Sequence, residues 1–431
     1  MTDFAPYDLL VDRDDVVAYL EAAGIAARLA PTPADIAVEE VTAGNMNRVF
    51  LARGPLGSVA VKQAPPWVQA VGPEWPVDPA RIATEARAYE LLASLVPASV
   101  PVIERIDLDR FVMVMEDLSD LPVLRDALVQ QVTDVAAGRT PIAIDFTSLG
   151  TVVGRFVAEL SLATSEVGLA PAERAELITA AANPELCEIT YAAVLEEPYK
   201  EHDHNHWVPE LDEAVRSMYT DSALLAGVAS VTDIFANRAE ALIHGDLHSG
   251  SLMVGTRDGA QAAKVFDPEF SFVGPIGMDL GIFWANMVIA GIAADAVGAH
   301  ELADARRSAV AASWAEFTVA LAERWPTRVG APDGLDLDAW LARIEGDAWA
   351  FAGVEGVRRT AGFSHAADIL SLPAHLVGGV YAEVLQRARD WVITRADAAG
   401  TTRGAGAAAS SLVSSSSTDI STSSSTEGTA R

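Results

Sequence analysis

The segment 242–254 contains the residues best suited to catalysis. Asp246 lies there between two apolar runs, on a loop that Gly245 and Gly250 would keep tight. A carboxylate held on such a loop can accept a proton from a substrate hydroxyl. The His-x-Asp-x-His spacing around it also suits hydrolytic metal sites, in which imidazoles bind zinc and a bound water attacks. A Gly-rich hairpin without a catalytic role is the plain alternative, so this segment alone leaves the chemistry open.

Two further carboxylates, Asp267 and Glu269, follow a short apolar strand. Residues at i and i+2 of an extended segment can face the same side. Hard oxygen ligands in this arrangement suit Mg²⁺ that is shared with the phosphates of a nucleotide, whereas zinc favours imidazole or thiolate. The pair therefore favours a site for ATP and Mg²⁺ over a zinc hydrolase. Two solvated carboxylates beyond a strand remain the alternative until Asp246 is placed beside them.

Lys62 lies within an apolar strand segment, where an unpaired ammonium would be costly to bury. ATP phosphates and a helical carboxylate, expected to be Glu85, would supply the anionic partners, as in the Lys and Glu pair of kinase sites. A lysine on an edge strand that points to water is the alternative. The turn that begins Gly44-Asn45 could cover phosphates with backbone N–H groups, although it lacks the G-x-G-x-x-G pattern.

A sheet and a set of helices must position these residues, and the apolar pattern predicts both. Strands are expected at residues 36–41, 47–53, 58–63, 102–107 and 111–115, with helices at 14–23 and 79–95. After the acidic turn 116–120 the pattern becomes mainly helical, apart from a strand-rich stretch at 241–266. The sequence thus predicts an α+β, bilobal fold. A small antiparallel-sheet lobe would span residues 1–115, a hinge 116–120 and a large helical lobe 121–400.

The composition limits the partners of the chain. Its 431 residues include 60 acidic and 30 basic side chains, which gives a net charge of −30, and 50% of the residues are hydrophobic. That apolar content allows a sizeable core. A negative field of this size repels nucleic acid and anionic lipids, so neither nucleic acid nor a membrane is an expected partner.

The single Cys187 and the start of the chain predict a cytoplasmic location, because no internal disulfide can form and no signal-peptide pattern is present. The uncharged apolar run 280–294 is too short for a membrane span and is interpreted as a buried helix. The segment 401–431 is rich in Ser, Thr, Gly and Ala, which predicts a disordered tail, with a regulatory tail as the alternative.

The order of these motifs along the chain resembles that of the kinase-like small-molecule phosphotransferases of the choline and aminoglycoside kinase type. The residues that carry the resemblance are Gly44-Asn45-Met46-Asn47, Lys62, Glu116-Asp117-Leu118, His244-Gly245-Asp246 and Asp267-Pro268-Glu269. Within this group the chain is most similar to the methylthioribose kinase family. The finer matches are Val61-Lys62-Gln63-Ala64, Val71-Gly72-Pro73-Glu74-Trp75-Pro76, the segments 244–251 and 267–270, and Arg358-Arg359-Thr360-Ala361-Gly362-Phe363-Ser364-His365.

Two departures from related kinases support this finer placement. Ser251 follows Asp246 by five residues, where protein kinases and aminoglycoside kinases usually carry Asn. The metal motif is Asp-x-Glu, at Asp267 and Glu269, in place of Asp-Phe-Gly. Both substitutions are usual in methylthioribose kinases.

The resemblance implies a protein-kinase-like fold, a homodimer, and transfer of the γ-phosphoryl group of ATP to the 1-hydroxyl of 5-methylthioribose, a step of methionine salvage. It also implies a role for each matched residue. Asp246 would accept the hydroxyl proton, Asp267 and Glu269 would hold Mg²⁺, and Lys62 with its partner Glu85 would bind phosphates. The backbone of Glu116 and Leu118 would receive adenine between the lobes.

The sugar is expected near Arg358 and Arg359, because guanidinium groups can hold hydroxyls and stabilise charge on the transferred group. Adjacent residues on one helix diverge by roughly 100°, so both can reach one site only at a helix end or turn. An arginine pair on a solvated helix face is the alternative. The segments of Trp75 and Trp207 are also matched to the sugar site of the family.

The segment before Trp207 departs from the family, because His206 stands where Arg is more usual. With His202 and His204 it forms an alternating set that could suggest a metal clamp, although no thiolate or fourth ligand is visible nearby.

Two other functions fit parts of the sequence. One is a phosphotransferase of the same fold that acts on choline, homoserine or an aminoglycoside, since an acidic chain suits cationic substrates. The other is a non-catalytic nucleotide-binding module that signals through its Ser-rich tail. The joint presence of Lys62, Asp246, Asp267 and Glu269 argues against this second function.

Overall fold

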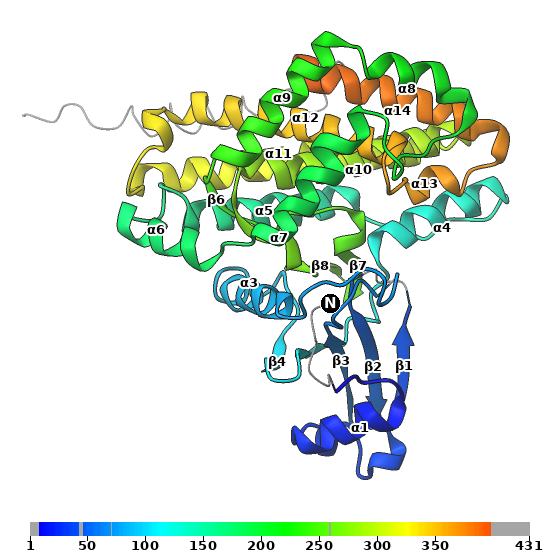
Figure 1. The fold of residues 1–431 in the computed structure, drawn as a ribbon, viewed down its shortest axis with the longest axis vertical. Coiled ribbons are helices and arrows are strands. Elements are labelled where there is room, and N and C mark those ends of the chain that lie inside the picture. The colour runs from blue at the N-terminus through cyan, green and yellow to red at the C-terminus, as the bar shows by residue number, and fades with distance from the viewer. Residues whose placement is uncertain (1–7, 43–45, 70, 258–259, 398–431) are drawn as a thin grey trace, which may run out of the picture.

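The computed structural model describes residues 8–42, 46–69, 71–257 and 260–397, which form a sheet lobe and a larger helical lobe (Figure 1). Five antiparallel strands in the order β1-β2-β3-β5-β4 build the sheet. The elements of this lobe are α1 (Arg13–Ala22), α2 (Ala26–Leu29), β1 (Ala37–Val41), β2 (Arg48–Gly54), β3 (Gly57–Gln63), α3 (Arg81–Leu95), β4 (Ile103–Asp107) and β5 (Val112–Glu116). Each strand and helix predicted here matches an observed element to within two residues, which confirms the small antiparallel-sheet lobe.

Strand β3 determines where Lys62 points. Val59 and Val61 belong to the apolar cluster that α1 covers, whereas Ala60 belongs to the cluster on the side of α3. Because side chains alternate along a strand, Lys62 shares the face of Ala60 and is directed toward α3. Its exposed fraction is 7%, and β3 lies between β2 and β5. The alternative of an edge-strand lysine in water is therefore wrong.

The helical lobe is organised around α10 (Ile276–Ala296), which is apolar on all sides. Among the described residues it is the one helix long and apolar enough to cross a membrane, but 94% of its most apolar stretch is buried inside the protein. The helices α11 (His300–Arg324) and α12 (Leu337–Ala361) pack along it. This confirms the buried helix predicted at residues 280–294.

Small residues allow the closest helix packing in this lobe. A Cβ atom on Gly150 or Gly154 of α5 (Phe146–Thr164) would lie 2.3 or 2.2 Å from a carbonyl oxygen of α11, so only glycine permits this approach. The remaining helices of this lobe, apart from single-turn 3₁₀ segments, are α4 (Leu124–Ala136), α6 (Pro171–Ala180), α7 (Pro184–Thr190), the π-helix Tyr191–Glu196, α8 (Asp212–Met218), α9 (Ser222–Asn237), α13 (Ala367–Leu370) and α14 (Ala374–Thr394).

Two short strand pairs interrupt the helices and hold the polar loops. Strand β6 (Ala241–Ile243) pairs with β9 (Phe272–Gly274), and β7 (Leu252–Arg257) pairs with β8 (Ala260–Val265). This confirms the strand-rich stretch predicted at 241–266. The loop of Asp246 connects β6 to β7, and the loop of Asp267 connects β8 to β9. The two pairings therefore bring both loops to the same place.

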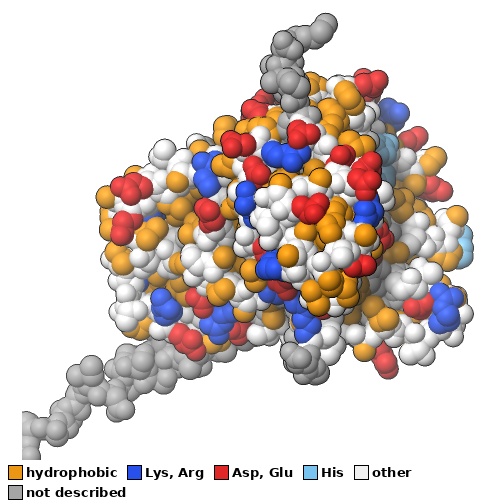
Figure 2. Space-filling view, turned by 90° about the horizontal axis from the view of Figure 1, so that it is seen from below, with side chains coloured by type: hydrophobic (Ala, Val, Ile, Leu, Met, Phe, Trp, Pro, Cys, Tyr) orange, Lys and Arg blue, Asp and Glu red, His pale blue; other side chains and the backbone are white. Residues whose placement is uncertain are grey.

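The face of the molecule seen from the sheet lobe carries acidic and basic side chains interspersed among apolar ones (Figure 2). On this face, the net negative charge of the chain therefore does not form one continuous acidic surface. The predicted tail at 401–431 lies outside the described residues.

Candidate active site

The loop that carries Asp246 is stabilised by hydrogen bonds to a buried carboxylate. Asp279, on the first turn of α10, accepts hydrogen bonds from the backbone N–H groups of His244 at 2.7 Å and Gly245 at 2.9 Å. Gly245 has a φ of +83°, a conformation that L side chains rarely adopt. Ser251 donates its hydroxyl to the Asp246 carbonyl at 2.8 Å. These contacts fix the loop, so the Asp246 carboxylate has a defined position.

Cationic and hydrogen-bonding groups surround the Asp246 carboxylate. His248 Nε2 lies 3.3 Å from one carboxylate oxygen, and Arg358 Nη2 lies 3.9 Å from the other. The Gly250 N–H donates to His248 Nδ1 at 2.7 Å, so the tautomer consistent with this bond carries its proton on Nε2, toward Asp246. Burial alone would raise the pKa of Asp246, but His248, Arg358 and Arg359 together hold it below its ordinary value. Asp246 is therefore an ionised hydrogen-bond acceptor at neutral pH.

Three carboxylates and Lys62 meet beside this loop. One oxygen atom each of Glu85, Asp267 and Glu269 lies within 4.8 Å of the others. Lys62 donates to Glu85 Oε1 at 2.7 Å and also forms an ion pair with Asp267. Asp267 adopts a left-handed backbone conformation with φ of 66°, and its N–H donates to the Tyr89 hydroxyl at 2.8 Å. The structure thus brings together the four residues that the sequence assigned to phosphate and metal binding.

The charges of this cluster are unbalanced. Burial, with the negative charge of Asp267 added, raises the pKa of Glu269 to about 8. Burial likewise raises the pKa of Glu85 to about 7, although Lys62 opposes this shift. The pKa of Lys62 is raised well above its ordinary value, because Asp267 and Glu85 outweigh the effect of burial. One ammonium therefore does not compensate three ionised carboxylates, and a divalent cation such as Mg²⁺, which would favour their ionised form, fits this set of oxygen ligands.

Two asparagines support the metal-binding segment. Asn47 donates to Glu269 Oε2 at 3.0 Å, and Asn183 donates to the Glu269 carbonyl at 2.7 Å. Both lie far from Glu269 in the sequence, and no local pattern indicated that they would contact it. Asn47 lay within the turn predicted to cover phosphates, but its neighbours Gly44 and Asn45 lie outside the described residues. Their role in ATP binding stays a prediction.

Arg358 and Arg359, in the last turn of α12, share one carboxylate partner. Glu355, one turn earlier, accepts hydrogen bonds from Arg358 Nε at 2.8 Å and Arg359 Nε at 2.7 Å. Its side chain is 1% exposed. Glu355 is not among the predicted site residues, although its spacing of three and four residues from the arginines is the usual signal for such helix pairs. Both arginines lie near the end of α12, at Ala361, but Arg359 is not among the residues that line the pocket beside Asp246, so its role at the sugar stays a prediction.

The buried Glu355 makes a pH-dependent contribution to stability. Burial would raise its pKa, but Arg358 and Arg359 lower it to about 2. A lowered folded-state pKa stabilises the protein above the unfolded-state pKa of roughly 4.3, by roughly 3 kcal/mol for a shift of this size. This contribution is lost as the pH falls from about 4.3 toward 2.

We therefore expect Glu355→Gln to destabilise the protein most at neutral pH. The difference in free energy of unfolding between wild type and variant should become smaller below about pH 4.5. Urea unfolding followed by circular dichroism at several pH values between about 7 and 3 measures this difference. Glu383→Gln on α14, which removes an exposed i,i+4 partner of Arg387, is the matched control and should show no such trend. A difference for Glu355→Gln that stays constant with pH would contradict the assigned role.

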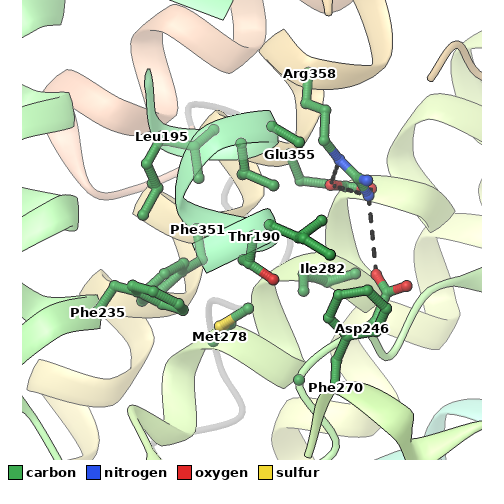
Figure 3. Close-up of a pocket in the computed structure, with 15 residues that line it drawn as sticks. Thr190, Leu195, Phe235, Asp246, Phe270, Met278, Ile282, Phe351, Glu355 and Arg358 are labelled. Atoms are coloured by element: carbon green, nitrogen blue, oxygen red, sulfur yellow. Dashed lines mark hydrogen bonds and ion pairs between the residues drawn. The ribbon is translucent and has the colours of Figure 1, made fainter. Parts of the chain in front are cut away.

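A pocket opens beside Asp246 (Figure 3). Asp246, Glu355 and Arg358 form its polar side, and the ion pair between Asp246 and Arg358 is visible there. The remaining wall is mainly apolar, and its largest side chains are Leu195, Phe235, Phe270, Met278, Ile282 and Phe351. The pocket thus suits a ligand with a hydroxyl at one end and an apolar group at the other.

The two tryptophans assigned to the sugar are not among the residues that line this pocket. Trp75 is 40% exposed and stacks on His204, with ring centroids 6.4 Å apart. Trp207 Nε1 donates to Asp212 at 2.7 Å. Their role in substrate binding therefore stays a prediction that these contacts do not support.

Residues 116–120, predicted as the hinge, begin at the end of β5. The Glu116 N–H donates to the Val102 carbonyl at 2.8 Å, and the Glu116 carboxylate accepts a hydrogen bond from Arg257. Leu118 is buried, and within the described ranges no group accepts a hydrogen bond from its N–H. That N–H is available to a ligand, and adenine binding at this hinge stays a prediction.

Known proteins place the chain among phosphotransferases. The model of the family described as "Phosphotransferase enzyme family" matches residues 37–317 of the chain. A methylthioribose kinase of Geobacillus thermodenitrificans is 35% identical over 336 residues, which cover 77% of this chain and 80% of the relative. The methylthioribose kinase of Geobacillus kaustophilus is 34% identical over 340 residues, with coverage of 78% and 81%.

Solved structures of kinases align with the chain at low sequence identity. An ethanolamine kinase of Plasmodium vivax aligns with a TM-score of 0.47 and 8% identity, over 91% of this chain and 93% of its own. From the family match and the identity to its relatives, the chain belongs to the phosphotransferase enzyme family, and within it to the methylthioribose kinases.

Proposed function

We propose that the chain transfers the γ-phosphoryl group of ATP to the 1-hydroxyl of 5-methylthioribose, giving 5-methylthioribose 1-phosphate and ADP in methionine salvage. The observation that carries this proposal is the pocket in which Asp246 and Arg358 face a wall of Phe235, Phe270, Phe351 and Met278. A sugar hydroxyl would reach the polar side, and the methylthio group would reach the apolar wall. Contacts between sulfur and aromatic rings are favourable by about 0.3–1.5 kcal/mol.

Asp246 would act mainly as a positioning acceptor in this reaction. Its lowered pKa means that it receives the hydrogen bond of the 1-hydroxyl as a carboxylate and takes the proton only as phosphoryl transfer proceeds. Arg358 lies on the same side of the pocket, where its guanidinium can hold a sugar hydroxyl or the transferred group. Orientation and charge compensation would then supply most of the rate enhancement.

The nucleotide would lie beside the carboxylate cluster. Lys62, held by Glu85, would bind phosphate oxygens, and the hinge at Glu116 and Leu118 would receive adenine. Asp267 and Glu269 would hold Mg²⁺, which when bound neutralises the charge that develops on the phosphates. The homodimer and the cytoplasmic location stay predictions from the resemblance and the composition.

The choice of acceptor follows from the charges in and beside the pocket. Asp246 and Glu355 balance Arg358 and Arg359, so these four side chains carry no net negative charge that would attract an ammonium group. Choline and aminoglycosides therefore gain no attraction there. Ribose could make the polar contacts but would leave the apolar wall unfilled.

An acceptor panel tests this function. We expect release of ADP with methylthioribose, a kcat/KM for ribose lower by at least about tenfold, and almost no turnover of choline, homoserine or kanamycin. The tenfold figure corresponds to burial of about two methylene-sized groups. A kcat/KM for choline or kanamycin comparable to that for methylthioribose would overturn the substrate and favour the cationic-acceptor alternative. The kinase fold would be unaffected by that result.

A further inference from the structure

A second group of metal-ligand side chains lies in the loop that precedes α8. Glu197, His202 and His204 each place one ligand atom within 4.8 Å of the others. We propose that these three side chains bind a divalent transition-metal ion, with Zn²⁺ as the best match, at a site separate from the Mg²⁺ site. The ligand set is two imidazoles and one carboxylate, which suits zinc and leaves a coordination position for water.

The separations fit zinc coordination. His204 Nδ1 lies 3.0 Å and His202 Nδ1 lies 3.7 Å from the same oxygen, Glu197 Oε2. Ligands about 2.0–2.1 Å from a tetrahedral zinc ion lie roughly 3.3 Å from one another. The two observed distances lie on either side of that value, so Glu197 Oε2 lies at about the separation from both imidazoles that zinc ligands require. The 3.3 Å hydrogen bond from the His204 N–H to His202 Nδ1 would be replaced by the bond to the metal.

The backbone around the site is held by one asparagine. Asn205 donates its side-chain amide to the Glu197 carbonyl at 2.6 Å and to the Lys200 carbonyl at 2.9 Å. The start and the end of the histidine segment are thereby tied together. A loop that is ordered before the metal binds loses less conformational entropy on binding.

The third histidine of the alternating set does not belong to this site. His206 Nδ1 faces the His204 carbonyl at 2.8 Å, and its ring stacks on His365 with centroids 4.6 Å apart. The fold therefore replaces His206 by Glu197 as the third ligand. This makes His206 the matched control for a binding experiment, because it lies in the same loop and has the same side chain.

Trp75 lies beside the proposed zinc site, so its fluorescence can report metal binding. The Trp75 ring, from the segment between β3 and α3, stacks on the His204 ring at an interplanar angle of 22°. A metal ion on His204 would lie close to this indole. Binding of a paramagnetic ion of the same ligand preference, such as Co²⁺, should therefore quench the fluorescence of Trp75.

The experiment uses the full chain in excess Mg²⁺, so that the cluster at Asp267 is occupied, and titrates Zn²⁺ by isothermal titration calorimetry. We expect one Zn²⁺ per chain. His202→Ala, His204→Ala and Glu197→Gln should each weaken its binding by at least about tenfold, the size expected for loss of a metal contact. His206→Ala and Asp267→Ala should leave the affinity within about twofold of wild type. Co²⁺ should quench wild type more than Trp75→Phe.

Three results would contradict the proposed zinc site. The first is the absence of saturable Zn²⁺ binding in wild type. The second is equal loss of affinity in His206→Ala and His204→Ala, which would indicate nonspecific binding by exposed imidazoles. The third is loss of Zn²⁺ binding in Asp267→Ala with retention in His204→Ala, which would assign the ion to the phosphotransfer site. Because all three ligands are at least partly exposed, the variants are expected to fold, and circular dichroism checks this.

Discussion

Replacing Asp246 by Asn lowers kcat by about 10²–10⁴ while ATP binding stays nearly unchanged, since this is the usual effect of losing a positioned general base. The amide keeps the shape of the carboxylate and can still accept the hydrogen bond from His248. It cannot take the proton of the acceptor hydroxyl, and it removes the negative charge that faces Arg358. None of the described contacts of Asp246 involves Lys62 or Asp267, so the nucleotide site stays intact.

Steady-state turnover with methylthioribose and calorimetric titration of ATP measure the two effects separately. Asp233→Asn, the same substitution at an exposed position of α9, is the control and should retain wild-type kcat. If the Asp246 variant kept more than half of wild-type turnover, Asp246 would have no part in the chemistry. If it lost ATP binding as well, the loss would be attributed to misfolding of the loop that Asp279 supports.

Asp267→Ala has the second largest expected effect, on the binding of ATP together with Mg²⁺. We expect the Mg²⁺ concentration needed for half-maximal activity to rise by at least about tenfold, as for loss of a metal contact. The variant also removes one partner of Lys62, which keeps its bond to Glu85. Glu269→Ala should act in the same direction and also destabilise the protein, because Glu269 is buried and receives a hydrogen bond from Asn47.

Activity as a function of Mg²⁺ concentration at fixed ATP measures this prediction, and thermal unfolding separates metal affinity from stability. Asp233→Ala is a suitable control, because Asp233 is exposed on α9 and lies outside the carboxylate cluster. Unchanged Mg²⁺ curves in both Asp267→Ala and Glu269→Ala would remove the metal role from this pair.

Local patterns in the sequence determined the framework of the protein. The alternation of apolar residues predicted the strands and the burial of Lys62, because the two-residue period of a strand can be recognised from neighbouring residues alone. The loop of Asp246 and the pair Asp267 and Glu269 were recognisable for the same reason, since each motif is short and follows an apolar strand. The resemblance that these motifs carry was sufficient for the family.

The tertiary structure alone decided which distant residues complete the sites. Asn47 reaches Glu269 from 222 positions away, and the apolar wall of the pocket comes from the π-helix, α9, α10 and α12. It also placed Glu197, rather than His206, beside His202 and His204. These contacts depend on how helices and loops pack against one another. A periodic pattern records which face of an element is buried, but not which side chain of another element it will meet.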